Sequence, residues 1–263
     1  MADRATTAPG PAAAKPWTVA GPEDAPAIVF VHATRLSREL WRPQLDRLAA
    51  TFRCIAIDLP GHGERAGEPF TLAAASDAVV AAIDAEVPSR RAVLVGLSLG
   101  GYVAIETAER CPEHVAGLVL SGCSAEPAGP VALAFRTLIW TLEHVPSRPL
   151  DTANRAFFRL RYGRAVADPI IEGGFWSAGG AQAVRALLRA RFLDRLARLW
   201  TPVLIVNGAL DPVFGPGGDP WAAACRRGRH VVLSRAMHLA SLDRPAAFSD
   251  AVASFVADPA AAA

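Results

Sequence analysis

The sequence predicts an α/β fold: a doubly wound, mostly parallel sheet flanked by helices, with a helical cap insertion. Two observations predict it. Short apolar runs without alternation recur along the chain, as expected of parallel strands buried on both faces. Helical patterns separate these runs, and this alternation implies right-handed crossovers within one sheet. The six predicted strands are residues 27–31, 54–57, 92–95, 117–120, 203–206 and 231–233.

Four helices are predicted around these strands. In the first, Leu40, Trp41, Leu45 and Leu48 recur at helical spacing. The last begins at Pro245, a residue that the first turn of a helix tolerates. The predicted helices are residues 38–50, 72–86, 101–110 and 245–257.

The segment 122–199 has no convincing strand and reads as helical and aromatic. An insertion after the fourth strand would lie above the carboxyl ends of the strands, where open α/β sheets place ligands. We therefore predict a core of residues 24–121 and 200–257, a cap of 122–199, and flexible tails at 1–23 and 258–263. Ala33, Trp140, Phe158 and Trp176 are candidate pocket residues, although the three aromatic residues can also fill only the cap's own core.

Composition excludes several classes of protein. The 263 residues are 52% hydrophobic and 20% charged, which indicates a globular chain, and a net charge of +2 does not suggest a nucleic-acid partner. Four scattered cysteines form no Cys-x-x-Cys pair and no Cys/His cluster, so we expect neither a zinc site nor a disulfide framework. No secretory signal precedes residue 17 and no run of about 18 apolar residues occurs, so we expect a cytoplasmic protein off the membrane. A monomer and a homodimer both remain open.

Ser98 is the first candidate catalytic residue. It lies in Gly96-Leu97-Ser98-Leu99-Gly100, directly after a predicted strand and before a predicted helix. This is the context of a nucleophile elbow, in which a sharp turn lifts the serine hydroxyl out of the sheet. The flanking glycines are expected because a Cβ there would collide with a neighbouring strand or helix. The alternative is a structural Gly/Ser turn.

A serine hydroxyl needs a base, and the base needs an acceptor that orients it. His238 follows the last predicted strand and is the candidate base, while Asp211 follows the preceding strand and is the candidate acid. Their order along the chain, Ser then Asp then His, is that of one known hydrolase architecture. The alternatives are a loop histidine for His238 and a turn-capping role for Asp211. The other candidates considered are His62, His114, His144 and His230 for the base, and Asp219 and Asp243 for the acid.

An oxyanion hole requires two backbone N–H donors. Leu99, the residue after the candidate nucleophile, supplies the first. Thr34, in the loop after the first predicted parallel strand, is our candidate for the second.

These residues resemble the α/β-hydrolase superfamily, in its small cap-bearing branch of esterases, lactonases, C–C bond hydrolases and cofactor-free haloperoxidase-like proteins. The resemblance covers about residues 24 to 256. The matching motifs are residues 32–34, 58–63 and 96–100 with Asp211 and His238, and residues 41–45 are similar to the 3-oxoadipate enol-lactonase type. One departure is Ala33, where the family usually has glycine after the histidine. Because a Cβ restricts φ, the loop is expected to shift there.

The resemblance implies a serine hydrolase that cleaves a small or medium hydrophobic carboxylic ester or lactone through an acyl-enzyme on Ser98. A serine nucleophile disfavours the dehalogenase and epoxide-hydrolase relatives, which require aspartate. The resemblance implies no cofactor and no metal. Two alternatives stay open. One is C–C bond hydrolysis or non-hydrolytic biosynthetic chemistry on the same triad. The other is a ligand sensor that signals through a protein partner, which a large exposed apolar patch on the cap would favour.

Overall fold

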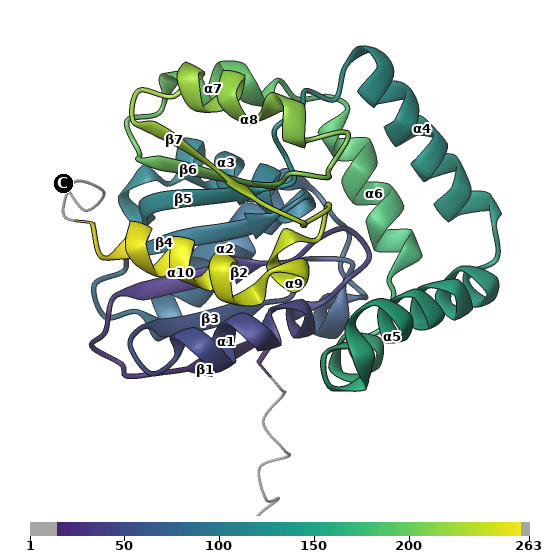
Figure 1. Cartoon of the computed structure of the whole chain (residues 1–263), viewed down its shortest axis with the longest axis horizontal. Helices are drawn as coiled ribbons and strands as arrows, with labels where there is room; N and C mark the ends of the chain where they lie inside the picture. The colour runs from purple at the N-terminus through teal and green to yellow at the C-terminus, as the bar shows by residue number, and fades with distance from the viewer. Residues whose placement is uncertain (1–14, 259–263) are drawn as a thin grey trace, which may run out of the picture.

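The computed structural model describes residues 15–258, which form one seven-stranded sheet between helices (Figure 1). The strand order is β1-β3-β2-β4-β5-β6-β7. β1 is antiparallel to β3, and every other neighbouring pair is parallel. The strands are β1 (Trp17–Ala20), β2 (Ala27–Val31), β3 (Arg53–Ile57), β4 (Ala92–Leu97), β5 (Val115–Ser121), β6 (Val203–Gly208) and β7 (Gly228–Leu233).

Helices cover both faces of this sheet. Successive residues of β2 point to opposite faces. Phe30 therefore belongs to one hydrophobic cluster with Trp41 and Phe248, while Val29 belongs to another with Val103. α1 and α10 lie on the first face, and α2 and α3 on the second (Figure 1). The helices of this core are α1 (Arg42–Leu48), α2 (Leu72–Glu86), α3 (Leu99–Arg110), α8 (Gly218–Ala224), α9 (Ala240–Asp243) and α10 (Pro245–Val256), with 3₁₀ turns η1 (Arg38–Trp41), η2 (Gly63–Arg65), η3 (Pro112–His114) and η4 (Gly215–Gly217).

Four helices lie between β5 and β6: α4 (Gly129–His144), α5 (Ser147–Glu172), α6 (Ser177–Leu187) and α7 (Phe192–Arg198). The first three, here called the inserted helices, lie together at one side of the sheet (Figure 1). α5 is two helical segments joined at Gly163, whose φ of 71° breaks the helix. α7 instead packs on α3, with the rings of Phe192 and Tyr102 4.5 Å apart. The last helix of the predicted cap therefore contacts the core.

The predicted parallel sheet is confirmed, since all six predicted strands are present. The sequence pattern does not predict β1, which falls inside the predicted tail 1–23, because this antiparallel edge strand is only half-buried and lacks an apolar run. Residues 1–14 and 259–263 of the predicted tails lie outside the described residues. β7 is not buried on both faces, since it forms the other edge and Val232 is 55% exposed. Within residues 15–258, no helix has the length and hydropathy of a membrane span.

Two buried histidines hold the loops that follow β2 and β3. His32 donates from Nδ1 to the Ala33 carbonyl (2.9 Å) and accepts the Leu59 N–H at Nε2 (3.0 Å). His62 donates from Nδ1 to the Pro60 carbonyl (3.0 Å) and accepts the Arg35 N–H at Nε2 (3.3 Å). Burial lowers the pKa of His32 to about 4, and burial followed by the nearby His32 lowers the pKa of His62 to about 3. Both side chains are therefore neutral structural groups at neutral pH.

These lowered pKa values predict an acid-sensitive fold. Unfolded histidines take up protons near pH 6.5, whereas His32 and His62 do so only near pH 4 and 3. The unfolded state therefore binds more protons between these values. Lowering the pH through this range reduces the free energy of unfolding by up to about 1.4 kcal/mol per pH unit for each histidine. Urea unfolding between pH 6.5 and 4.5 measures this slope.

The variant His32→Gln separates the contribution of one histidine, because glutamine can accept the Leu59 N–H and does not titrate. We expect its slope to be shallower by about one proton. His144→Gln, at an exposed position of α4, is the matched control. Equal slopes for His32→Gln and the parent protein would contradict a neutral, buried His32.

Candidate functional site

Ser98 lies at the apex of the turn between β4 and α3, with φ 54° and ψ −113°. A non-glycine residue rarely adopts a positive φ, so the surrounding structure must hold this conformation. A Cβ on Gly96 would lie 2.3 Å from the Gly100 carbonyl oxygen, and a Cβ on Gly100 would lie 2.0 Å from that of Val31. The two glycines are therefore required by close backbone contacts with α3 and β2, which is the steric reason inferred from the sequence.

Asp211 and His238 form a hydrogen-bonded pair at the carboxyl ends of β6 and β7. His238 Nδ1 lies 2.9 Å from Asp211 Oδ2. The other carboxylate oxygen, Oδ1, accepts the N–H groups of Val213 (3.0 Å) and Phe214 (3.1 Å). Asp211 thus caps its own turn and also orients the imidazole. Burial raises the pKa of Asp211, but hydrogen bonds from His238 and these N–H groups outweigh it and lower the pKa.

The alternative candidates have other partners. His230 pairs with Asp219 (2.7 Å) and His114 with Asp84 (3.1 Å), while His144 contacts the Trp140 carbonyl (2.9 Å). Asp243 accepts the Met237 N–H at 2.7 Å, so it holds the loop that carries His238 rather than the imidazole itself. All six histidines are among the described residues, and His238 is the one that shares a hollow with Ser98.

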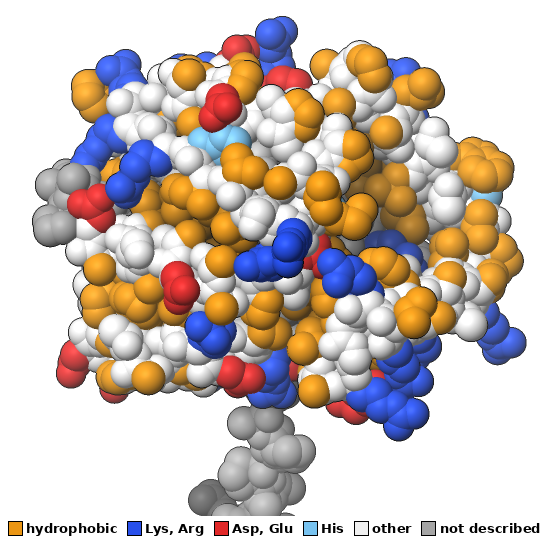
Figure 2. Space-filling view, viewed as in Figure 1, with side chains coloured by type: hydrophobic (Ala, Val, Ile, Leu, Met, Phe, Trp, Pro, Cys, Tyr) orange, Lys and Arg blue, Asp and Glu red, His pale blue; other side chains and the backbone are white. Residues whose placement is uncertain are grey.

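This hollow has a volume of about 420 Å³ and lies between the sheet and the inserted helices. Ser98 and His238 line it together with Ala33 and Thr34 from the loop after β2. Most of its wall is apolar, and Figure 2 shows the surface hollowed among these helices with hydrophobic side chains around it. The other lining residues are Arg35, Leu36, Tyr102, Phe135, Leu138, Asn154, Phe157, Phe158, Val184, Leu187, Phe214 and Leu239.

Two backbone N–H groups, those of Thr34 and Leu99, lack a hydrogen-bond partner among residues 15–258. Thr34 N–H makes no hydrogen bond to any residue from 15 to 258. Leu99 is the first residue of α3, where the N–H has no carbonyl of a preceding turn to bond. Ala33 is not among the described residues with positive φ, so its Cβ carries no penalty; the positive φ of the loop 32–36 falls at Arg35 (66°).

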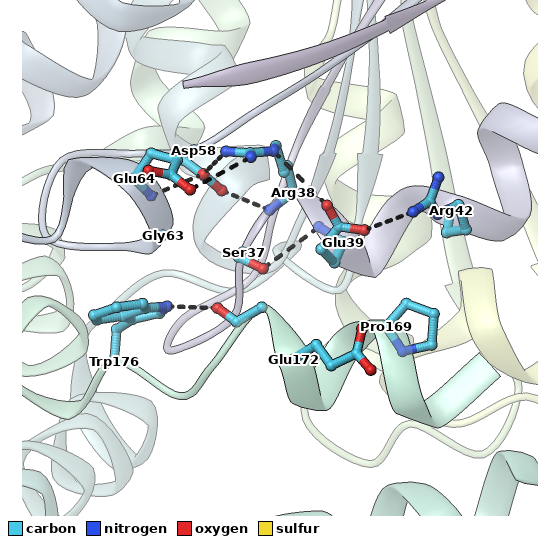
Figure 3. A pocket seen from close by; sticks show the side chains of 11 residues that line it. Ser37, Arg38, Glu39, Arg42, Asp58, Gly63, Glu64, Pro169, Glu172 and Trp176 are labelled. Atoms are coloured by element: carbon cyan, nitrogen blue, oxygen red, sulfur yellow. Dashed lines mark hydrogen bonds and ion pairs between the residues drawn. The ribbon is translucent and has the colours of Figure 1, made fainter. Parts of the chain in front are cut away.

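Two of the predicted pocket residues lie elsewhere. Trp140 is 58% exposed on α4, with its ring stacked on His144 at 5.2 Å. Trp176 lines a second, polar hollow together with Arg38 and Glu172, and its indole N–H donates to the Gly173 carbonyl (Figure 3). Neither residue lines the hollow that contains Ser98, because the aromatic composition of the segment does not tell which of its side chains face that hollow. Ala33 and Phe158 do line the hollow.

Sequence reasoning missed most of the pocket wall. Tyr102 follows Ser98 by four residues, one helical turn, so the spacing could have indicated that it lines the same hollow. The Phe214 ring stacks on the His238 imidazole, with centroids 5.0 Å apart, and its position after Asp211 was a weaker signal. Asn154 and Phe157 depend on how α5 lies, which no local pattern indicates.

One group of possible metal ligands occurs in the described part of the chain: Cys111, Glu113 and His114, with ligand atoms within 4.8 Å of one another. It precedes β5, whereas Ser98 follows the neighbouring parallel strand β4. The group therefore lies at the amino ends of the strands, whereas the hollow lies at their carboxyl ends, so the group takes no part in the hollow.

Comparison with known proteins supports the same architecture. Residues 28–251 match the alpha/beta hydrolase family. A pimeloyl-acyl-carrier-protein methyl ester esterase of Edwardsiella ictaluri is 31% identical over 87% of this chain and 92% of its own length. The 3-oxoadipate enol-lactonase 1 of Acinetobacter baylyi is 25% identical over 90% of each chain.

Solved structures share the fold. A thermophilic esterase from Thermogutta terrifontis superposes with a TM-score of 0.79 at 24% identity, covering 94% of this chain and 93% of its own. A hydrolase from Pseudomonas aeruginosa has a TM-score of 0.77 at 27% identity, covering 92% and 94%. Because the family match spans most of the sequence and the observed sheet agrees with it, the chain belongs to the alpha/beta hydrolase family.

Proposed function

We propose that this protein is a serine hydrolase that cleaves a carboxylic ester or lactone through an acyl-enzyme on Ser98. The observation that carries the proposal is the convergence of Ser98 and the Asp211–His238 pair on one apolar hollow. A nucleophile, a base and a group that orients the base are the parts that acyl transfer requires. The names of the esterase and lactonase relatives support the same reaction class.

In the proposed mechanism, His238 Nε2 takes the proton of the Ser98 hydroxyl as its oxygen attacks the carbonyl carbon. Asp211 accepts the Nδ1–H, which fixes the tautomer and stabilises the imidazolium that forms. The Thr34 and Leu99 N–H groups bind the oxyanion of the tetrahedral intermediate. The C–O bond to the alcohol then breaks, and the alcohol takes the proton from His238. Water repeats the sequence to release the acid and restore Ser98.

The walls of the hollow favour a hydrophobic acyl group of small or medium size. Phe135, Leu138 and Phe157 contribute apolar surface, and a volume of about 420 Å³ does not suit a long polymer. Few polar side chains line the hollow, and the proposed mechanism already uses groups of Thr34 and His238. We therefore propose small or medium hydrophobic esters and lactones as substrates.

Exposed side chains on the inserted helices favour a second candidate function, ligand sensing through a protein partner. Leu133, Trp140 and Leu160 are large, apolar and mostly exposed on α4 and α5, and none of them lines the hollow. Exposed apolar side chains are a feature of protein interaction sites. A sensor would bind its ligand with a measurable affinity and turn it over no faster than the Ser98→Ala variant does.

The proposed nucleophile is tested by Ser98→Ala. We expect kcat/KM on p-nitrophenyl esters to fall by about a thousandfold or more, because only the oxyanion hole and binding would remain. A fluorophosphonate should add its mass to the parent protein and not to the variant. Ser254→Ala, at an exposed position of α10, is the control. Activity of Ser98→Ala within tenfold of the parent would exclude this role.

The proposed pocket wall is tested by Phe158→Leu. Phe158 is 4% exposed and lines the hollow, so a smaller side chain there should shift the ranking of acyl chains towards longer or branched ones. Trp140→Ala, outside the hollow, is the control and should leave the ranking unchanged. The kcat/KM values over a series of p-nitrophenyl acyl esters give the comparison. An unchanged ranking for Phe158→Leu would assign Phe158 to packing alone.

The family departure at Ala33 is tested by Ala33→Gly. Because Ala33 does not have a positive φ, glycine relieves no such strain in the folded state and adds entropy to the unfolded chain. We expect a free energy of unfolding lower by about 0.4–1 kcal/mol with kcat unchanged. Thermal unfolding and initial rates give both values, and a higher kcat would instead mean that Ala33 restrains the loop.

A further inference from the structure

Arg35 occupies the strained position of the loop 32–36, directly after the proposed oxyanion donor Thr34. Its φ of 66° is uncommon for a residue with a side chain. Such a conformation persists only where neighbouring groups hold it. The groups that hold Arg35 therefore also determine where the Thr34 N–H points.

The backbone of Arg35 is fixed on both sides. Its N–H donates to His62 Nε2 (3.3 Å), from the turn after β3. Its carbonyl accepts the Trp176 N–H (2.9 Å), from the segment between α5 and α6. The first contact comes from the core and the second from the segment that joins two inserted helices, so the loop is held between them.

The side chain of Arg35 makes a second contact with the inserted helices. Arg35 Nη2 lies 2.8 Å from Asp151 Oδ1 on α5, and the two side chains are only 12% and 27% exposed. Burial lowers the pKa of Arg35, and the Asp151 carboxylate offsets part of that shift. A charge pair this sheltered from water is screened less than a surface pair and is costly to break on one side.

The start of α6 leaves this loop little room to move. A Cβ on Gly180 would lie 2.8 Å from Arg35 Cγ and 3.2 Å from Thr34 Cγ2. The helix backbone thus packs directly against both side chains. If the ion pair with Asp151 were lost, α6 would block one direction, so the loop could move only away from α6.

From these contacts we propose that Arg35 and Asp151 form a positioning pair, which ties the loop bearing Thr34 to α5 and thereby holds the Thr34 N–H towards Ser98. The pair does not touch the reacting atoms. The catalytic meaning of the inference rests on the proposed function, whereas the restraint on the loop does not. Since α5 also carries Phe157 and Phe158, one helix both forms the wall for the acyl group and holds the oxyanion donor.

The variant Asp151→Ala tests this pair, because it removes the tie and leaves the Arg35 backbone intact. We expect kcat on p-nitrophenyl butyrate to fall about tenfold to a hundredfold while KM changes less than about threefold, since a displaced donor weakens the transition state more than substrate binding. The Ki of phenylboronic acid, which forms a tetrahedral adduct with a serine hydroxyl, should rise in parallel. Asp151→Glu, which keeps the charge, should recover part of the kcat.

Hydrogen–deuterium exchange of the peptide spanning residues 32–36 provides a readout that does not depend on turnover. We expect about tenfold faster exchange there in Asp151→Ala. Asp168→Ala is the matched control, because Asp168 lies on the same helix and pairs with Arg159 at 3.0 Å on the exposed surface. It should leave kcat, Ki and exchange within twofold of the parent.

The possible outcomes separate the two proposals. A rise in KM with unchanged kcat, or unchanged exchange at residues 32–36, would overturn the positioning role and leave Arg35 as a wall of the hollow. A parent protein that neither hydrolyses esters nor binds phenylboronic acid would overturn the proposed function. In that case faster exchange in Asp151→Ala would still support the restraint on the loop.

Discussion

The close approach of α3 to β2 and β4 is the constraint on which the site depends. Gly96 and Gly100 allow close backbone contacts where a Cβ would lie 2.3 Å and 2.0 Å from a carbonyl oxygen. That contact compresses the strand-to-helix connection into one residue, and Ser98 takes the positive φ that results. The same geometry leaves the first N–H groups of α3 without carbonyl partners at the carboxyl end of the sheet. Side chain and donor are thus exposed together by one packing requirement.

A buried polar network lies beneath Asp211 and His238, the proposed partners of Ser98. Asn207, at the end of β6, accepts the Gly122 N–H at 3.2 Å and donates to Ser124 Oγ at 2.8 Å and to the Phe214 carbonyl at 3.1 Å. These bonds join the segment after β5 to the turn that carries Asp211. Leaving one such buried group unpaired would cost about 1–3 kcal/mol, which favours keeping the two segments together. Phe214 in turn stacks on His238, which fixes the imidazole from the face while Asp211 fixes it from the edge.

The residues that the sequence predicts best are those set by local rules. Continuous apolar runs identify six strands, and the strand-turn-helix context identifies Ser98, because both depend on neighbours along the chain. His238 and Asp211 follow from chain order, since parallel strands bring the loops at their carboxyl ends to one edge. The edge strand β1 escapes prediction for the converse reason: its partner β3 lies more than thirty residues away and its own side chains are half-buried.

The pocket wall could not be predicted because it depends on how the inserted helices lie on the core. Phe158 and Trp140 belong to neighbouring helices and have similar hydrophobicity, yet one is buried beside Ser98 and the other faces solvent. α5 also breaks at Gly163, and the start of α6 packs closely on the core at Gly179 and Gly180. No helical periodicity encodes these features. Arg35 shows the same dependence. In the sequence Arg35 is only a charged residue next to Thr34. In the folded chain it contacts Asp151, His62 and Trp176, and these contacts join the loop 32–36 to the inserted helices.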